Sequence, residues 1–328
     1  MLEKRPLGKN GPLVNPLGFG CMSFAGFFGE TTEEESLECL AAVHAAGIDF
    51  WDTANIYGMG RSEAVVGKYL AQSGADITLA TKASIRPGPP RTVSNEAGHL
   101  REELEKSLKL LNRDKVELFY IHRREAERPI QEVVETLAGF IEEGLIDGYG
   151  LSEVAPSTIR QAHAVHPCRA VQNEYSLWSR QPELGVIQAC AELEIAFVPF
   201  SPLARGMFGQ TPVHHSTMKD SDFRKVNPRF MEPNYSYNRR FVDALGAFAA
   251  EKGVSTPALA IAWVLAQGDN MFPIPATRSA KHLAQWKDAG DITLGAEDLA
   301  QIAAIMPVGW AAGDRYSDTQ LRSVERYC

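Results

Sequence analysis

Short apolar runs that alternate with longer amphipathic runs constrain this fold more than any other feature of the sequence. Eight short runs can be recognised, at residues 17–20, 48–51, 77–80, 116–121, 146–151, 170–172, 195–200 and 271–274. Strands that alternate with helices predict a parallel sheet whose faces are covered by helices. Eight such units predict a (β/α)8 TIM barrel, preceded by a β-hairpin over residues 2–17 with its turn at residues 9–12.

Local signals predict helices between these strands. Thr32 and Glu35 have capping-box spacing, and Leu37, Leu40 and Ala41 then predict an apolar helix face. A second helix is predicted to place four leucines on one face: Leu100, Leu104, Leu108 and Leu111.

The chain length of 328 residues allows either one domain or two. A doubly wound nucleotide-binding sheet is the competing fold, and it would require Gly-x-Gly-x-x-Gly after a strand. Only Gly18-Phe-Gly20 and Gly148-Tyr-Gly150 approach this motif, and both lack its third glycine. We therefore predict one barrel domain over residues 1–328. Its one long irregular segment, residues 201–237 after strand seven, is either a lid over a site or a disordered insertion.

The charge and the chain ends limit the partners. The net charge is −8 and the pI about 5.6, which disfavours nucleic acid and anionic membranes. The longest uncharged run, residues 10–29, holds five Gly and two Pro, so it predicts loop and strand and not a spanning helix. The first residues lack the apolar core of a signal peptide, which predicts a cytoplasmic protein.

Cysteine and histidine spacing give no sign of a metal site. The five cysteines are widely separated, which predicts reduced thiols: Cys21, Cys39, Cys168, Cys190 and Cys328. No acid or cysteine at ligand spacing accompanies His163 and His166 or the His214-His215 pair, so we expect no metal.

Polar residues of complementary types follow three successive strands. Asp52 ends the second strand and is followed by Tyr57, Lys82 ends the third, and His122 ends the fourth. Each could be a turn, solvated or structural residue when taken alone. Active sites of such barrels lie at the carboxyl ends of the strands, so the four side chains are expected on one rim.

These residue types suit proton transfer to a carbonyl or alcohol oxygen. A free tyrosine has a pKa near 10, and a neighbouring lysine should lower it. Asp52 would hold Lys82 in place, and His122 could orient the substrate oxygen or pass a proton. No side chain supplies hydride, so a cofactor is required.

Seven motifs then resemble the aldo-keto reductases over essentially the whole chain, and most of all the bacterial and plant-type members of the pyridoxal reductase and auxin-induced kind. They follow the predicted strands in the family's order: Phe50-Trp-Asp52-Thr-Ala-Asn-Ile-Tyr57-Gly58, Leu79-Ala-Thr-Lys82, Tyr120-Ile-His122-Arg, Gly150-Leu-Ser152-Glu153, Val171-Gln172-Asn-Glu-Tyr175, Phe200-Ser-Pro-Leu203 and Pro273-Ile-Pro275-Ala-Thr-Arg278.

The resemblance implies a barrel that binds NADPH, with NADH possible. Its catalytic tetrad would be Asp52, Tyr57, Lys82 and His122, with Tyr57 the general acid in carbonyl reduction and the base in alcohol oxidation. The cofactor-binding residues that it implies are Gly20, Cys21, Met22, Asp52, Ser152, Glu153, Gln172, Phe200, Ser201, Pro202, Leu203, Arg205, Ile274, Ala276, Thr277, Arg278, His282 and Gln285.

Individual roles follow from the same resemblance. Ser152, Glu153 and Gln172 would hold the nicotinamide carboxamide, and Phe200 would stack on the ring. Arg205 would line the pyrophosphate, and Arg278 would bind the 2′-phosphate through its guanidinium.

The substrate and the alternatives complete the sequence-based hypothesis. Phe24, Phe27, Phe28 and Trp178 could line a pocket for a small carbonyl or alcohol substrate, or they could pack loops on the barrel. One alternative function is a regulatory channel-type subunit that binds NADPH with little turnover. Another is a lyase or isomerase barrel that binds a sugar phosphate at Arg278. The sequence does not fix the oligomeric state or the direction of reaction.

Overall fold

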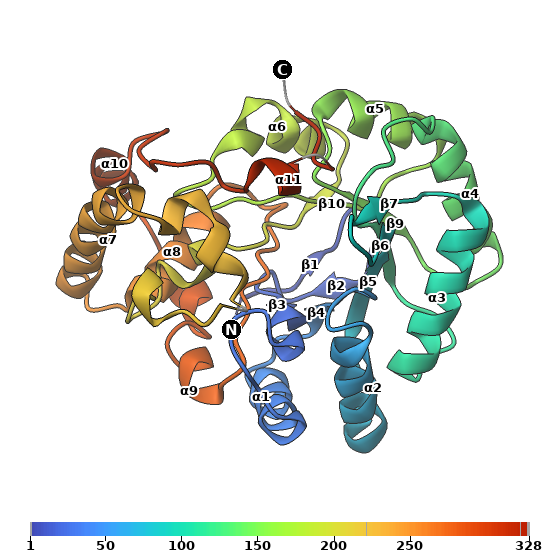
Figure 1. The fold of residues 1–328 in the computed structure, drawn as a ribbon, viewed down its shortest axis with the longest axis horizontal. Helices are drawn as coiled ribbons and strands as arrows, with labels where there is room; N and C mark the ends of the chain where they lie inside the picture. Colours follow the sequence, from blue (N-terminus) through green and yellow to red (C-terminus); the bar gives the residue numbers. More distant parts are fainter. Residues whose placement is uncertain (1, 221, 322, 327–328) are drawn as a thin grey trace.

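A curved parallel sheet of seven strands forms the centre of the computed structural model (Figure 1). The structure describes residues 2–220, 222–321 and 323–326. The hydrogen-bonded order is β3 (Phe19–Gly20), β4 (Phe50–Asp52), β5 (Thr78–Ala83), β8 (Leu118–Ile121), β9 (Tyr149–Ser152), β10 (Ala170–Gln172) and β11 (Ala196–Phe197). Seven of the eight predicted runs thus contain a strand of this sheet, and all neighbours are parallel.

The eighth predicted run, residues 271–274, is not a regular strand among the described residues. Pro273 and Pro275 lack backbone N–H groups, so this segment cannot donate a continuous hydrogen-bond ladder. It still meets both edges of the sheet through isolated parallel bridges, which join Phe197 to Met271, Phe200 to Ile274 and Gly20 to Ala276.

Helices surround the sheet on its outer side, except α11 (Asp318–Leu321), which lies near the cavity (Figure 1). The outer helices are α1 (Glu33–Ala45), α2 (Arg61–Ser73), α3 (Ala97–Leu111), α4 (Ile130–Glu142), α5 (Pro156–Val165), α6 (Val186–Glu192), α7 (Asn234–Glu251), α8 (Thr256–Leu265), α9 (Ala280–Leu283) and α10 (Ala296–Ile305).

The predicted helix signals are largely confirmed. The Thr32 hydroxyl accepts from the Glu35 amide while the Glu35 carboxylate accepts from the Thr32 amide, so α1 begins with the expected capping box. The four leucines of α3 are all buried. The prediction for Ala41 is wrong: Ala41 is exposed, and α1 buries Cys39 and Val43 beside Leu40.

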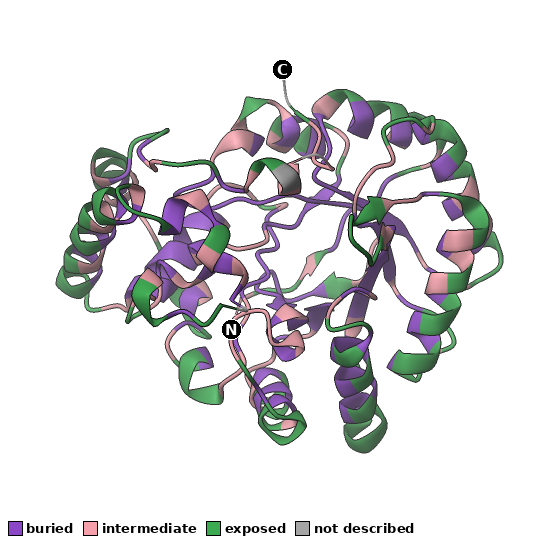
Figure 2. Cartoon of the chain, in the orientation of Figure 1, coloured by how far each residue is buried: buried purple, intermediate pink, exposed green. Residues whose placement is uncertain are grey.

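Buried side chains form two layers, one between sheet and helices and one inside the curve of the sheet (Figure 2). The inner layer includes Phe50, Tyr120 and Phe272. The predicted N-terminal hairpin is present as β1 (Arg5–Pro6) and β2 (Leu13–Val14), and it adds Leu7 and Val14 to the inner layer.

The long segment after β11 is shorter and more ordered than predicted. It contains four short 3-10 helices, namely η3 (Ala204–Gly206), η4 (His215–Thr217), η5 (Phe223–Val226) and η6 (Pro228–Phe230). Helix α7 begins at Asn234, so Tyr237 is helical and not in the loop. A second hairpin, β6 (Ile85–Arg86) with β7 (Thr92–Val93), follows β5 and was not predicted.

Two further observations concern the chain as a whole. In the described part of the chain, none of the helices combines the length and the apolar content needed to cross a membrane. Cys21, Cys39, Cys168 and Cys190 are buried free thiols, and Cys328 lies outside the described residues.

Candidate active site

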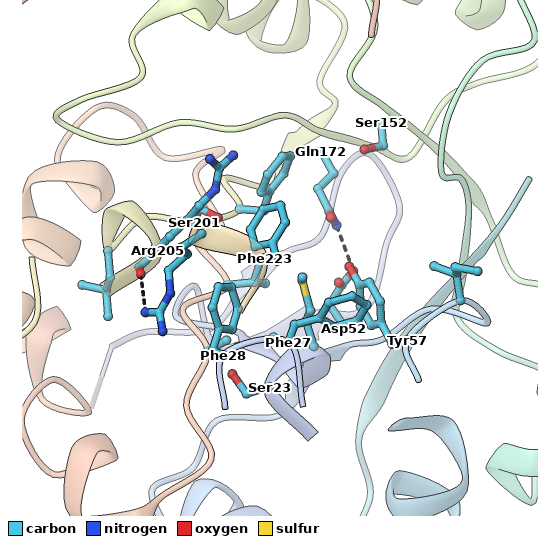
Figure 3. Close-up of a pocket in the computed structure, with 18 of the residues that line it drawn as sticks. Ser23, Phe27, Phe28, Asp52, Tyr57, Ser152, Gln172, Ser201, Arg205 and Phe223 are labelled. Carbon is cyan, nitrogen blue, oxygen red and sulfur yellow. Dashed lines mark hydrogen bonds between the residues drawn. The ribbon is translucent and has the colours of Figure 1, made fainter. Parts of the chain in front are cut away.

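A cavity of about 1050 Å³ lies at the carboxyl ends of the parallel strands (Figure 3). Gly20, Asp52, Ser152 and Gln172 line it, and each is the last residue of its strand. The parallel register brings these ends together, because Gly20 pairs with Asp52 and Gln172 pairs with Ser152. The cavity therefore lies where the strand order predicted a site.

Asp52 and Lys82 form a fully buried ion pair beneath this cavity. The Lys82 ammonium donates to Asp52 Oδ1 and, over 2.7 Å, to the backbone carbonyl of Thr53. Asp52 Oδ2 accepts from Gln172 Nε2 over 2.8 Å (Figure 3). Burial raises the pKa of Asp52 and lowers that of Lys82, while the pairing opposes both shifts. The Thr53 carbonyl thus fixes Lys82, Gln172 fixes Asp52, and the two charged groups fix each other.

Tyr57 covers the ion pair on the cavity side. It lies in the turn between β4 and α2, held by hydrogen bonds from its amide to Ala54 O and from the Ser62 amide to its carbonyl. Its ring centroid is 5.4 Å from Lys82 Nζ and 5.8 Å from the His122 ring, which meets it edge-on. The structure thus brings Asp52, Tyr57, Lys82 and His122 together.

The electrostatics of Tyr57 differ from the expectation. Burial raises the pKa of Tyr57 and Asp52 raises it further, while Arg123 acts in the opposite direction. The expected lowering of this pKa by Lys82 is therefore not found. The reason is physical: Asp52 neutralises the ammonium in direct contact, so little of its charge acts on the phenol.

His122 is a neutral imidazole in this environment. Burial holds its pKa well below the usual range, and the charges of Arg123, Lys82 and Arg91 lower the pKa further. Its Nδ1 atom is buried and has no hydrogen-bond partner among the described residues. Of the two roles left open by the sequence, orientation of a substrate oxygen suits a neutral ring better than proton delivery.

Most residues implied to bind the cofactor line the cavity. They are Gly20, Met22, Asp52, Ser152, Gln172, Phe200, Ser201, Pro202, Leu203, Arg205, Ile274, Ala276, Thr277, Arg278, His282 and Gln285. Cys21 and Glu153 do not line it: Cys21 is fully buried, and Glu153 is 1% exposed.

Glu153 faces away from the cavity, contrary to the expected carboxamide contact. Its backbone has a positive φ of 56° at the end of β9. Its carboxylate forms an ion pair with Arg315 and accepts from the Glu174 amide over 2.8 Å. Its hydrogen-bonding capacity is thus used inside the protein.

Arg205 lines the cavity and is already paired within the protein, so its expected pyrophosphate role stays a prediction. Its guanidinium contacts Glu174 at 2.8 Å and lies over the Tyr316 ring at 4.5 Å. Arg278 differs, because its Nη1 donates to the carbonyl oxygen of Phe28 and no described carboxylate forms an ion pair with it. Arg278 therefore keeps its charge available to a phosphate.

The aromatic residues expected at the substrate pocket divide into two groups. Phe27 and Phe28 line the cavity, and the Phe27 ring is 6.2 Å from the Tyr57 ring. Phe24 is fully buried against Phe19, and Trp178 packs in an aromatic cluster, so neither lines the cavity. Their predicted substrate contacts are not supported, because both rings pack against other aromatic side chains in the interior.

Several cavity residues were missed from the sequence. The β6–β7 hairpin contributes Arg91, the residue after His122 is Arg123, and the C-terminal segment contributes Tyr316 and Gln320. Arg123 could have been found, because it adjoins a strand-end histidine. The tail residues carry no motif, and their place depends on tertiary contacts alone. The described residues contain no group of three potential metal ligands.

Comparisons with known proteins find relatives over most of the chain. The model of the aldo/keto reductase family matches residues 16–307. The chain is 39% identical over 315 residues to "Probable aldo-keto reductase 1" of Glycine max, covering 94% of this chain and 90% of that protein. It is 34% identical over 311 residues to "Aldo-keto reductase yakc [NADP(+)]" of Schizosaccharomyces pombe, covering 92% of each.

Solved structures share the fold. The glycerol dehydrogenase AKR11B4 of Gluconobacter oxydans superposes with a TM-score of 0.85 at 23% identity, covering 96% of this chain and 98% of that one. An aldo/keto reductase of Klebsiella pneumoniae, solved in complex with NADP and acetate, superposes with a TM-score of 0.73 at 23% identity, covering 96% and 99%.

Proposed function

Because this chain belongs to the aldo/keto reductase family, we propose that it transfers hydride between NADP(H) and an aldehyde or ketone, with Tyr57 as general acid–base. The observation that carries the proposal is the position of Tyr57. It lies on the cavity between the buried Asp52–Lys82 pair and the neutral His122. Such a group of side chains suits proton transfer to one oxygen atom.

The cavity fits a dinucleotide and a small substrate together. Its volume of about 1050 Å³ is at the upper end of the range for ligand sites, roughly 300–1,000 Å³. Ser152 and Gln172 offer polar groups for the carboxamide, Phe200 offers a ring, and Arg278 offers an unpaired guanidinium. Reduced nicotinamide bound there would supply the hydride that no side chain can.

The chain's own residues hold the substrate oxygen and supply the proton. His122 orients the carbonyl oxygen through a neutral ring nitrogen. Tyr57 donates its proton to that oxygen as negative charge develops on it, which general-acid catalysis requires. The Lys82 ammonium, fixed by Asp52 and the Thr53 carbonyl, lies 5.4 Å from the Tyr57 ring centroid and helps to hold that ring at the cavity.

We also infer that residues 271–276 act as the eighth strand of one barrel domain. Their bridges to β11 and β3 support this inference, since they link the two edges of the sheet. The cofactor residues around Arg278 then lie next to the end of β3 and belong to the same site.

Substitution of Tyr57 by Phe tests the function. We expect Tyr57→Phe to lower kcat for an aromatic aldehyde at least ~100-fold, because one general acid contributes about 10²–10⁴-fold. The ring is kept, so NADPH should still quench the protein fluorescence on titration, with a dissociation constant near that of the wild type.

The outcomes separate the alternatives. Wild-type turnover that survives in Tyr57→Phe would overturn the general-acid role. Binding of NADPH by the wild type without reduction of any aldehyde or ketone would instead point to a binding module.

A further inference from the structure

The arginines that line the cavity fall into two classes. Three of them have carboxylate partners: Arg124 pairs with Glu325, Arg205 with Glu174 and Arg224 with Asp222. The other three form no ion pair with any described carboxylate: Arg91, Arg123 and Arg278. Under the proposed function, Arg278 has a ligand in the 2′-phosphate of the cofactor, which leaves Arg91 and Arg123 without one.

Arg123 lies next to the reacting groups. It directly follows His122, and its Nη1 donates to the His122 carbonyl over 2.6 Å and to Ser152 Oγ over 3.2 Å. Both acceptors are neutral, so the positive charge of this half-buried guanidinium is not offset. That charge acts on the substrate end of the cavity, since Arg123 lowers the pKa of both Tyr57 and His122.

Arg91 acts on the same end of the cavity. It lies in the turn between β6 and β7, which also lines the cavity, and its charge contributes to the low pKa of His122. The nearby carboxylates do not offset the two arginines. Glu125 forms an ion pair with Arg128 at 3.0 Å and accepts a hydrogen bond from the Asn95 backbone amide. Glu127 is exposed at the rim of the cavity. A net positive surface therefore borders Tyr57.

We propose that Arg123, assisted by Arg91, binds a carboxylate of the substrate, so that the preferred substrates are aldehydes or ketones that also carry a carboxylate. This inference rests on the proposed function. A planar guanidinium matches a carboxylate in a two-point contact, and a partly desolvated charge without a partner favours a ligand of opposite sign.

The reaction itself is unchanged by this contact. Reduced nicotinamide, when bound, would supply hydride to the carbonyl carbon and be oxidised, and the carbonyl oxygen would receive the Tyr57 proton. The substrate carboxylate stays ionised and serves only to hold the molecule. Because Arg123 also contacts Ser152, one residue would link the substrate to a group expected at the nicotinamide carboxamide.

Two substrates of nearly equal size test the proposal. 4-Carboxybenzaldehyde and its methyl ester, methyl 4-formylbenzoate, carry the same aldehyde but differ in charge. For the wild type with NADPH, we expect a KM about tenfold or more lower for the acid, since a charge-assisted hydrogen bond is worth a factor of this order.

Substitution of Arg123 gives the sharper comparison. Arg123→Gln should raise KM for the acid about tenfold relative to KM for the ester, so the ratio of the two KM values is the readout. Arg123→Lys should fall between, because it keeps the charge and loses the planar fork. Arg101→Gln is the matched control: Arg101 pairs with Glu143 on the outer surface, and its loss should change neither substrate.

A binding measurement separates this proposal from the proposed function. The dissociation constant of 4-methylbenzoate, measured by calorimetry, should rise about tenfold in Arg123→Gln whether or not any aldehyde is reduced. Absence of turnover by the wild type would overturn the proposed function. The dissociation constant of 4-methylbenzoate would then still show whether Arg123 binds a carboxylate.

The proposal is overturned if the wild type has the same KM for the acid and the ester, or if Arg123→Gln lowers activity on both substrates while the ratio of their KM values stays unchanged. In the second case Arg123 only positions His122 and Ser152. An unchanged affinity for 4-methylbenzoate would have the same meaning.

Discussion

The arginines of this site show that the partners of a residue decide what it can do. Arg205 and Arg278 both line the cavity and both were expected to bind phosphate. Arg205 is held by Glu174, whereas the hydrogen-bond acceptor of Arg278 is a neutral backbone carbonyl. The charge of Arg278 is thus the one that remains for a ligand.

Removal of Arg278 should therefore separate the two nicotinamide cofactors. We expect Arg278→Ala to weaken NADPH binding about tenfold or more and NADH binding less than about threefold, because only NADPH carries the 2′-phosphate. Fluorescence titration with each cofactor measures both constants. If the affinities for NADPH and NADH fell equally, Arg278 would not be a 2′-phosphate ligand.

The buried carboxylate of Glu174 makes stability depend on pH. Burial alone would raise its pKa, but Arg205, Arg315 and Arg229 outweigh burial and lower it. We expect Glu174→Gln to cost about 3 kcal/mol of unfolding free energy near neutral pH, since it leaves the buried Arg205 guanidinium without its carboxylate partner.

The sign of this pH dependence follows from the lowered pKa. A carboxyl group with a lowered folded-state pKa stabilises the protein above its unfolded pKa, near 4.3, and loses that contribution as the pH falls. The difference between wild type and Glu174→Gln in urea unfolding should thus shrink below about pH 4. A difference that stays constant from pH 7 to pH 3 would contradict this account.

Residue-level prediction from the sequence succeeded where local order places the side chain. Asp52 ends its strand, Lys82 is the last but one residue of its strand and His122 directly follows a strand, so a correct strand assignment also locates them. The inward orientation and ion pairing of the Glu153 carboxylate could not be predicted, because they depend on Arg315, which is 162 residues further along the chain. No local pattern carries that information.

At the scale of elements, the segment from residue 201 to 233 lies against the loop after β3. The Phe28 and Phe223 rings are 6.1 Å apart, edge to face, and the Arg224 guanidinium lies 5.1 Å from the Phe28 ring centroid (Figure 3). At the surface, Lys219 forms an ion pair with Glu30 at 2.9 Å. These contacts span the cavity side where phosphate binding is proposed.

Cofactor binding should stabilise this segment against proteolysis. We expect saturating NADPH to slow tryptic cleavage after Lys219 and Lys225 several-fold, because a ligand that binds only the folded arrangement of this segment shifts the equilibrium toward it. Phe223→Ala should reduce the protection. Cleavage followed by mass spectrometry gives the rates, and identical rates with and without NADPH would contradict the expectation.

Element-level prediction followed the hydrophobic pattern and failed where that pattern is absent. Buried parallel strands are continuous apolar runs, which is why seven of them were located. The β6–β7 hairpin is short and largely exposed, so it has no such run. The segment with Pro273 and Pro275 has the apolar residues of a strand but lacks the amides that a regular ladder needs.

At the scale of the whole molecule, strand β3 contacts the segment that follows α8. Gly20 donates from its amide to the Pro275 carbonyl over 2.9 Å, and Ala276 bridges to Gly20. Residues more than 250 positions apart therefore share one hydrogen-bonded edge, which favours a single cooperative unit.

Differential scanning calorimetry tests whether the chain unfolds as a single cooperative unit. We expect one unfolding transition with equal calorimetric and van't Hoff enthalpies, of roughly 230 kcal/mol at about 0.7 kcal/mol per residue. Two separated transitions, or a van't Hoff enthalpy near half the calorimetric value, would contradict a single domain over residues 1–328.

The enclosure of Lys82 has a consequence for an enzyme that handles aldehydes. Free amines condense with aldehydes to imines, and an exposed lysine beside the substrate would be consumed by this side reaction. Lys82 has no exposed surface, lies beneath Tyr57, and has its ammonium occupied by Asp52 and the Thr53 carbonyl. The fold thus keeps an amine beside the cavity while denying an electrophile access to its nitrogen. Lysine-directed labelling reagents should therefore modify surface lysines and leave Lys82 intact.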